Sequence, residues 1–144
     1  MKIINEWKSV DFKKIIELYD SVGWTAYTKD LDSLKIAFEN STLVNLAVSD
    51  EGEVIGLTRS VSDSISIHYL QDIIVSPNYQ RKGIGRKLLE KSLEYFKNVR
   101  THMILTDDDE KQLKFYSSMD YRNTKDLEKF ALNTFIKMKD VELI

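Results

Sequence analysis

One stretch of the sequence, residues 72–89, combines an apolar strand, a tight basic loop and the start of a helix. The strand ends at Asp72–Val75, the chain's only proline is Pro77, and the loop carries Gly83 and Gly85. Glycine lets the backbone approach an anion closely, and a helix that begins directly afterwards adds the positive end of its dipole. Four cationic side chains lie in the same loop: Arg81, Lys82, Arg86 and Lys87. The stretch therefore predicts a site for a cofactor that carries a diphosphate.

Composition limits what else the chain can be. With 144 residues, 42% of them hydrophobic, it fits one compact domain over residues 1–144 that buries a sizeable core. A net charge of -2 and a pI of about 5.7 argue against nucleic acid or a membrane surface as partner, because both usually bind a basic face. The absence of cysteine excludes disulfides, thiolate metal sites and a thiol nucleophile, and two separated histidines make a zinc site improbable.

The N-terminus predicts a cytoplasmic protein. Charged residues interrupt the first seven residues, which therefore lack the apolar core of a signal peptide. No run of the sequence approaches the roughly twenty apolar residues that a membrane span needs. The expected partners are therefore neither membrane nor nucleic acid.

Hydrophobic periodicity predicts an α+β fold with strands of mixed direction, flanked by about four helices. The predicted helices are Asp11–Asp20 (with Ser9 as N-cap), one from about Asp30, one from the basic loop to about Asn98, and Asp109–Met119. The predicted strands are residues 2–7, Leu43–Val48, Glu53–Val61, Ile65–Val75, Thr101–Thr106, and two late ones at Tyr121–Asn123 and Ala131–Met138. The strand ending at Val75 is apolar on both faces, which predicts a central position in the sheet.

The basic loop fits one phosphate-binding pattern and not two others. It lacks the G-x-x-x-x-G-K-[ST] of a nucleoside triphosphate loop and the third glycine of a dinucleotide-binding G-x-G-x-x-G. It does match Q/R-x-x-G-x-G/A, over Gln80–Gly85, directly after a strand. Further on, Leu113–Tyr121 is similar to an F-Y-x-x-x-G-F segment, with Asp120 in place of glycine. Both motifs, in this order, resemble the GCN5-related N-acetyltransferase (GNAT) superfamily.

The resemblance implies a mixed sheet of six to seven strands, splayed between strands 4 and 5, with acetyl-coenzyme A as cofactor. It places the pantetheine arm on the backbone of Ile73, Ile74 and Val75, in the manner of an added strand. The pyrophosphate would lie on the loop formed by Gln80, Arg81, Lys82, Gly83, Ile84, Gly85 and Arg86. The alternative is that these cations only keep an exposed helix start soluble and bind no ligand. Positive charge there is unfavourable by about 0.3–1 kcal/mol per residue, so a bound anion explains it better.

Two residues are candidate catalytic groups. Tyr116 aligns with the tyrosine that protonates the leaving thiolate in this family, and a phenol of pKa ~10 can donate to a thiolate of pKa ~8.5. Asp72 is the candidate base for the acceptor amine; the alternative is that it satisfies a backbone group at a strand irregularity. His68 and Tyr69, on the same strand, are weaker candidates for the base. A core position beside Phe115 is the alternative for Tyr116.

Trp24 and Tyr27 are predicted to line the acceptor pocket, because the loop between the first two helices walls that side in this family; aromatic core positions are the alternative. The expected function is direct transfer of the acetyl group from acetyl-coenzyme A to a primary amine of a small molecule. A noncatalytic acyl-coenzyme A-binding module and a peptide or protein acetyltransferase remain as alternatives. Late strands of the family often pair across a dimer, which makes Ala131–Met138 a candidate homodimer edge.

Overall fold

The computed structural model describes residues 1–144, which form two compact units, Met1–Leu105 and Thr106–Ile144. The first unit contains the whole β-sheet and four α-helices, and the second contains a single α-helix. No helix of the structure combines the length and the hydropathy needed to cross a membrane.

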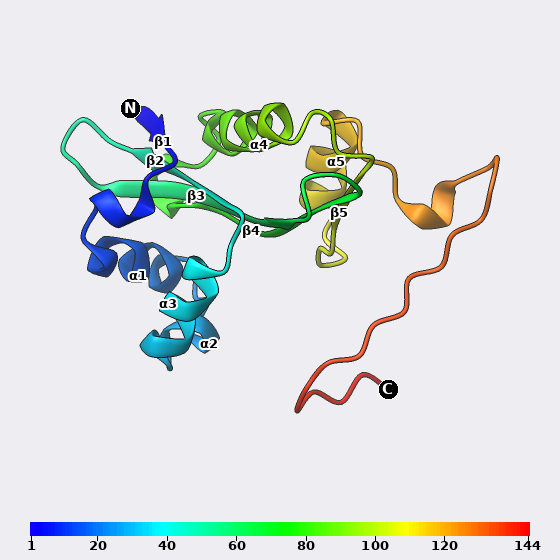
Figure 1. The fold of residues 1–144 in the computed structure, drawn as a ribbon, viewed down its shortest axis with the longest axis horizontal. Helices are drawn as coiled ribbons and strands as arrows, with labels where there is room; N and C mark the ends of the chain where they lie inside the picture. Colours follow the sequence, from blue (N-terminus) through cyan, green and yellow to red (C-terminus); the bar gives the residue numbers. More distant parts are fainter. The chain divides into compact units, whose positions relative to one another are not determined.

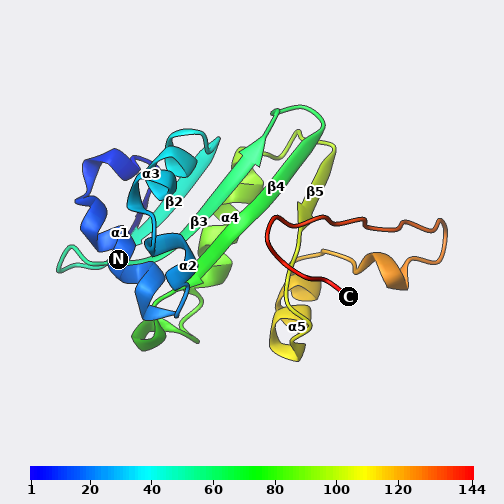
Figure 2. The same ribbon diagram turned by 90° about the horizontal axis from the view of Figure 1, so that it is seen from below.

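The first unit is built on one five-stranded sheet in the order β1-β2-β3-β4-β5 (Figures 1 and 2). Its strands are β1 (Lys2–Ile4), β2 (Leu43–Val48), β3 (Val54–Ser62), β4 (Ile67–Val75) and β5 (Thr101–Ile104). The pairs β1–β2, β2–β3 and β3–β4 are antiparallel, whereas β4 and β5 pair in parallel. The predicted mixed strand direction is therefore confirmed, but the sheet has five strands and not six to seven.

Helices cover both faces of this sheet (Figure 1). On one face lie α1 (Phe12–Ser21), α2 (Thr25–Thr28) and α3 (Leu31–Glu39), and on the other lies α4 (Ile84–Tyr95). The main apolar core joins α1 and α3 to the sheet, and a smaller cluster packs under α4. Short 3₁₀ turns occur at Trp7–Ser9 and Pro77–Tyr79.

The predicted cap of the first helix is wrong by two residues. Asp11, not Ser9, is the N-cap of α1, and its carboxylate accepts from the N–H of Lys13 at 3.0 Å. A carboxylate at this position satisfies a free donor and also interacts favourably with the helix dipole. Ser9 ends the preceding 3₁₀ turn, where its hydroxyl donates to the carbonyl of Glu6.

A bulge in β4 decides which side chains reach which face of the sheet. Asp72 pairs with Arg59 and Leu70 pairs with Ser60, so Gln71 is an extra residue in β4. Because side chains alternate along a strand, one extra residue moves every later side chain to the opposite face. Asp72 consequently faces α1, whereas His68 contacts Phe96 after α4.

In the second unit, α5 (Glu110–Ser118) is followed by a 3₁₀ turn at Thr124–Asp126 and otherwise irregular chain. The two predicted late strands, Tyr121–Asn123 and Ala131–Met138, are therefore wrong. An alternating pattern becomes a strand only where a neighbour takes its backbone hydrogen bonds, and no strand pairs with either segment. The apolar side chains behind the second prediction are exposed, Phe135 by 94%.

The end of α5 shows why Tyr121 is not in a strand. The N–H of Asp120 donates to the carbonyl of Ser117 at 3.2 Å, and the N–H of Tyr121 donates to the carbonyl of Tyr116 at 3.1 Å. These two bonds define a Schellman turn, whose left-handed residue is usually glycine. Asp120 takes that conformation with φ of 66°, so the turn forms even though aspartate replaces the glycine of the family pattern.

Candidate active site

The basic loop follows the C-terminal end of β4 and opens α4. Arg81 and Gly83 both have left-handed backbone, with φ of 62° and 77°. The N–H groups of residues 81–83 donate to no backbone carbonyl, and the first N–H groups of any helix lack an intrahelical partner. Gln80 holds the loop to the strand, since its amide donates to the carbonyl of Val75 at 3.0 Å. The loop therefore has the backbone donors that a diphosphate requires.

Half of β4 has no strand beside it on its outer edge. The parallel ladder with β5 covers only Ile67–Leu70, so Gln71–Val75 run on without a partner there. Ile74 is buried in the main core, while Ile73 and Val75 are half-buried. The backbone of the three residues predicted to bind pantetheine is therefore at an open edge, directly before the basic loop.

Asp72 lies at the centre of a buried polar network. Its Oδ2 accepts from Arg59 Nε at 2.7 Å and from the Tyr19 hydroxyl at 2.8 Å. Its Oδ1 accepts from the Tyr27 hydroxyl at 3.0 Å, and the Gln71 amide donates to that same hydroxyl at 3.1 Å. The side chains of Arg59 and Asp72 are only 7% and 1% exposed. The carboxylate is thus paired and hydrogen-bonded, as a buried charge must be.

Both tyrosines of this network are held as neutral phenols. Burial raises the pKa of Tyr19 well above its ordinary value, and the negative charge of Asp72 adds to the effect. Burial, followed by the Asp72 charge, raises the pKa of Tyr27 as well. Both hydroxyls are therefore donors to the carboxylate. These three protein partners weigh against Asp72 as a base, although that role stays a prediction.

The two residues predicted to line the acceptor pocket lie at α2. Trp24 is the N-cap residue of this helix and Tyr27 lies within it, with ring centroids 6.2 Å apart. The Tyr27 ring is also 5.2 Å from that of Tyr19. Trp24 remains 38% exposed and Tyr27 is half-buried. Both aromatic side chains are thus only partly buried in the core, and their exposed surface is accessible to a ligand.

The two weaker base candidates differ in environment. His68 is fully buried, stacks on Phe96 at 4.2 Å, and shares an Nδ1–Nδ1 hydrogen bond of 2.8 Å with His102. Burial, with a smaller effect of His102, lowers the pKa of His68 to about 4. It lies on the α4 face, opposite Asp72. The pKa of Tyr69 is raised by burial and then by the Asp72 charge, so this phenol stays protonated at neutral pH.

Tyr116 belongs to the second unit, on α5. It is buried and packs edge-on against Phe115 and Tyr121, at centroid distances of 5.1 and 5.9 Å. Burial, followed by the effect of Tyr121, raises the pKa of Tyr116. The Tyr121 hydroxyl is buried without a hydrogen-bond partner. Tyr116 is therefore a protonated phenol at neutral pH, which suits a proton donor.

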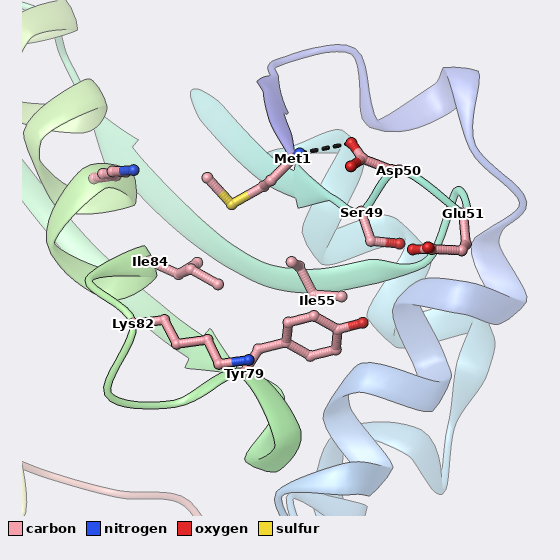
Figure 3. A pocket seen from close by; sticks show the side chains of 9 residues that line it. Met1, Ser49, Asp50, Glu51, Ile55, Tyr79, Lys82 and Ile84 are labelled. Carbon is pink, nitrogen blue, oxygen red and sulfur yellow. Dashed lines mark hydrogen bonds and ion pairs between the residues drawn. The ribbon is translucent and has the colours of Figure 1, made fainter.

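A pocket of about 280 Å³ lies beside the basic loop (Figure 3). From the loop side, Tyr79, Lys82 and Ile84 face Ile55 of β3, and the β2–β3 turn supplies an acidic rim that includes Asp50. The amino group of Met1 forms an ion pair with Asp50 at 2.8 Å. Lys82 and Lys87 also line this pocket, so acidic and basic side chains both face it.

Comparison with known proteins identifies the family of this chain. Residues 16–141 match the family model of the GNAT acetyltransferase domain. The chain belongs to the GNAT acetyltransferases. A GNAT-family protein from Streptococcus pneumoniae TIGR4 is 32% identical and has a TM-score of 0.73, with 92% of this chain and 96% of that chain covered.

Other GNAT relatives are more distant. An uncharacterized N-acetyltransferase of Pyropia yezoensis is 21% identical over 117 residues, which are 79% of this chain and 66% of that protein. A histone acetyltransferase of Glycine max is 26% identical over 83% of this chain and 55% of its own length. This chain therefore spans about half to two thirds of these curated relatives. An aminoglycoside acetyltransferase from a soil metagenome, in complex with sisomicin, shares the fold at 21% identity, with a TM-score of 0.64.

Arg59 and Tyr19 are site residues that the sequence patterns did not identify. Arg59 is the one charged residue within β3, and Asp72 is the one charged residue within β4. Two lone opposite charges on neighbouring apolar strands are a usable signal for a buried ion pair. Tyr19 carries no such signal, because a tyrosine on the apolar face of a helix is an ordinary core residue.

Proposed function

We propose that this GNAT protein transfers the acetyl group of acetyl-coenzyme A directly to a primary amine of a small molecule. The observation that carries the proposal is the open edge of β4 at residues 71–75, followed directly by a loop with left-handed turns at Arg81 and Gly83. An extended ligand can add to an open strand edge, and its anionic end can bind free N–H groups at a helix start.

In this proposal acetyl-coenzyme A supplies an activated acetyl thioester. The backbone of Ile73, Ile74 and Val75 holds the pantetheine, and the N–H groups of residues 81–86 hold the pyrophosphate. Arg81 and Lys82 add positive charge. Tyr116 donates a hydrogen bond or a proton to the departing thiolate. The pKa of Tyr116 is raised above that of an ordinary phenol, so full proton transfer from its hydroxyl to a thiolate whose thiol has a pKa of ~8.5 is uphill. Stabilisation of the thiolate by a hydrogen bond is therefore favoured.

A noncatalytic acyl-coenzyme A-binding module is the rival function. One observation favours it: the carboxylate that was predicted as the base is occupied by Arg59, Tyr19 and Tyr27. The amine must still lose a proton before it can attack, and in an enzyme a water molecule or another group would then accept it.

Release of free thiol from acetyl-coenzyme A separates the two functions. The panel of acceptors should contain polyamines, arylalkylamines, amino sugars and peptides, with an amine-free reaction as control. The proposal predicts amine-dependent release that saturates with at least one small amine. Release with peptides alone would favour a peptide acetyltransferase. Binding of acetyl-coenzyme A without release in any reaction would favour the noncatalytic module.

A further inference from the structure

The ion pair between Arg59 and Asp72 is placed to control a residue of the acceptor wall. The two residues are direct partners across β3 and β4, and the bulge at Gln71 turns Asp72 toward α1 and α2. Arg59 Nε contacts Oδ2 at 2.7 Å, while Arg59 Nη1 reaches the Ser41 hydroxyl at 3.3 Å. A guanidinium has several donors in a fixed plane, so these contacts restrict both its position and that of the carboxylate.

The carboxylate in turn fixes the Tyr27 hydroxyl. Tyr27 donates its single proton to Asp72 Oδ1 at 3.0 Å and accepts from the Gln71 amide at 3.1 Å. A phenol has one proton and two lone pairs. One lone pair of Tyr27 therefore remains, and it can only accept a hydrogen bond.

The Arg59 guanidinium also lies near two aromatic rings, 5.9 Å from the centroid of Tyr27 and 5.7 Å from that of Phe38. Such contacts add to the orientation of the Tyr27 ring. The charges of Arg59 and Asp72 compensate each other, so this ion pair adds no net charge beside the hydroxyl and the ring of Tyr27.

We propose that Arg59 is a positioning residue that acts through Asp72 to present the Tyr27 hydroxyl as a hydrogen-bond acceptor for the N–H groups of the acceptor amine. This rests on the proposed function, and it narrows the acceptor to amines that offer an N–H donor next to an apolar or aromatic-binding body. Asp72 is then an anchor for Tyr27 and not the group that takes the proton.

The test compares Tyr27→Phe, Arg59→Lys and the double variant. Lysine keeps the charge but cannot bind Asp72 and Ser41 through one planar group, and it avoids leaving a buried carboxylate without a countercharge. Thr58→Ser is the matched control, because Thr58 is buried next to Arg59 on β3 but bonds Ser92 on the opposite face. Each protein is first shown to be folded by circular dichroism.

We expect Tyr27→Phe to raise the KM for the amine about tenfold, as loss of one hydrogen bond does. Arg59→Lys should raise the KM for the amine about threefold to tenfold. In the Tyr27→Phe background the same substitution should raise this KM little further. The dissociation constant of acetyl-coenzyme A should stay within about twofold throughout, because the cofactor loop is untouched. Thr58→Ser should leave the KM for the amine unchanged. An unchanged amine KM in folded Arg59→Lys, or effects of the two substitutions that simply multiply, would overturn the proposal.

A second readout does not need turnover. The ¹³Cζ resonance of Tyr27, assigned by its loss in Tyr27→Phe, should shift in Arg59→Lys and stay in place in Thr58→Ser. An unshifted resonance in Arg59→Lys overturns the positioning of Tyr27 even if no amine is acetylated. Absence of thiol release by the wild-type protein, with the resonance shifted as expected, would instead overturn the proposed function and the amine recognition while supporting the positioning by Arg59.

Discussion

Tyr116 and its neighbour Tyr121 show how burial separates two similar side chains. Tyr116 is buried on α5 and Tyr121, just after it, is half-buried; desolvation raises both pKa values, that of Tyr121 to about 12. Only Tyr121 has a hydroxyl that is buried without a partner. An unsatisfied buried hydroxyl costs about 1–3 kcal/mol, so Tyr121 should lower stability through its hydroxyl. Tyr116 is the one of the two that we propose takes part in the reaction.

Tyr116→Phe should lower kcat about 100-fold, the scale expected when one hydrogen-bond donor to a developing negative charge is lost, and leave the affinity for acetyl-coenzyme A nearly unchanged. The measurement is steady-state thiol release together with calorimetry. Tyr121→Phe is the control, and it should increase the free energy of unfolding by roughly 1 kcal/mol because it removes the unsatisfied hydroxyl. Equal kcat in wild type and Tyr116→Phe would remove Tyr116 from the mechanism.

His68 makes the stability of the first unit depend on pH. Its pKa is lowered from 6.5 to about 4 by burial, so the unfolded chain binds the proton more tightly. The free energy of unfolding therefore falls as the pH drops below 6.5, by up to about 1.4 kcal/mol per unit, until the folded protein also binds the proton near pH 4. Protonation of both His68 and His102 would also leave their shared hydrogen bond without an acceptor.

Urea unfolding at pH 7 and pH 5 tests this linkage. The wild-type protein should lose on the order of 2 kcal/mol between the two pH values through His68. His68→Asn is less stable at both pH values but should lose less between them, because it cannot bind the proton. The same loss in both proteins would show that His68 does not set the acid limit.

At the scale of single elements, the sequence predicted most of the first unit. The bounds of β2 agree with the prediction Leu43–Val48, because all six residues are buried and their apolar pattern is unambiguous. The bulge at Gln71 was not predictable, since one extra residue changes no local propensity and is revealed only by the pairing with β3. The same bulge decides that Asp72 meets Tyr19 and Tyr27, so the network around it also escaped the sequence patterns.

The prediction of the two late strands was wrong for a related reason. Alternating apolar residues in Ala131–Met138 satisfy the local signal for a strand, but pairing depends on a partner that local sequence does not specify. At Asp120 the turn forms although the local residue does not favour it. The family pattern has glycine at this position, yet the two backbone hydrogen bonds of the Schellman turn hold aspartate in left-handed backbone.

Asp120→Gly should therefore stabilise the end of α5. Glycine takes φ of about +60° without the cost of about 1–2 kcal/mol that other residues meet there, although part of this gain is lost to the greater freedom of the unfolded chain. The expected gain is about 1 kcal/mol in the free energy of unfolding. Asp120→Ala should give no gain, because alanine keeps the Cβ atom that opposes this backbone conformation. A lower free energy of unfolding for Asp120→Gly than for the wild type would contradict the claim that the backbone of Asp120 is strained.

At the scale of the whole molecule, the family model matches residues 16–141 and so covers most of both units. The first unit contains the open edge of β4, the basic loop and the residues predicted to line the acceptor pocket, whereas the second contains Tyr116, the predicted proton donor. We therefore expect cofactor binding to depend mainly on residues of the first unit. The chain has a formal net charge of -2, yet four cations lie close together in the basic loop and the first turn of α4, so we expect an anion to bind there.

Calorimetric titration of the full chain with acetyl-coenzyme A tests the central claim most directly. The account predicts one saturable site per chain, weakened at least tenfold in Arg81→Glu/Lys82→Glu, since the reversed charges would repel the pyrophosphate. Both proteins should show the same circular dichroism spectrum. No detectable binding of millimolar acetyl-coenzyme A by the folded wild-type protein, or equal affinity in the reversed variant, would contradict it.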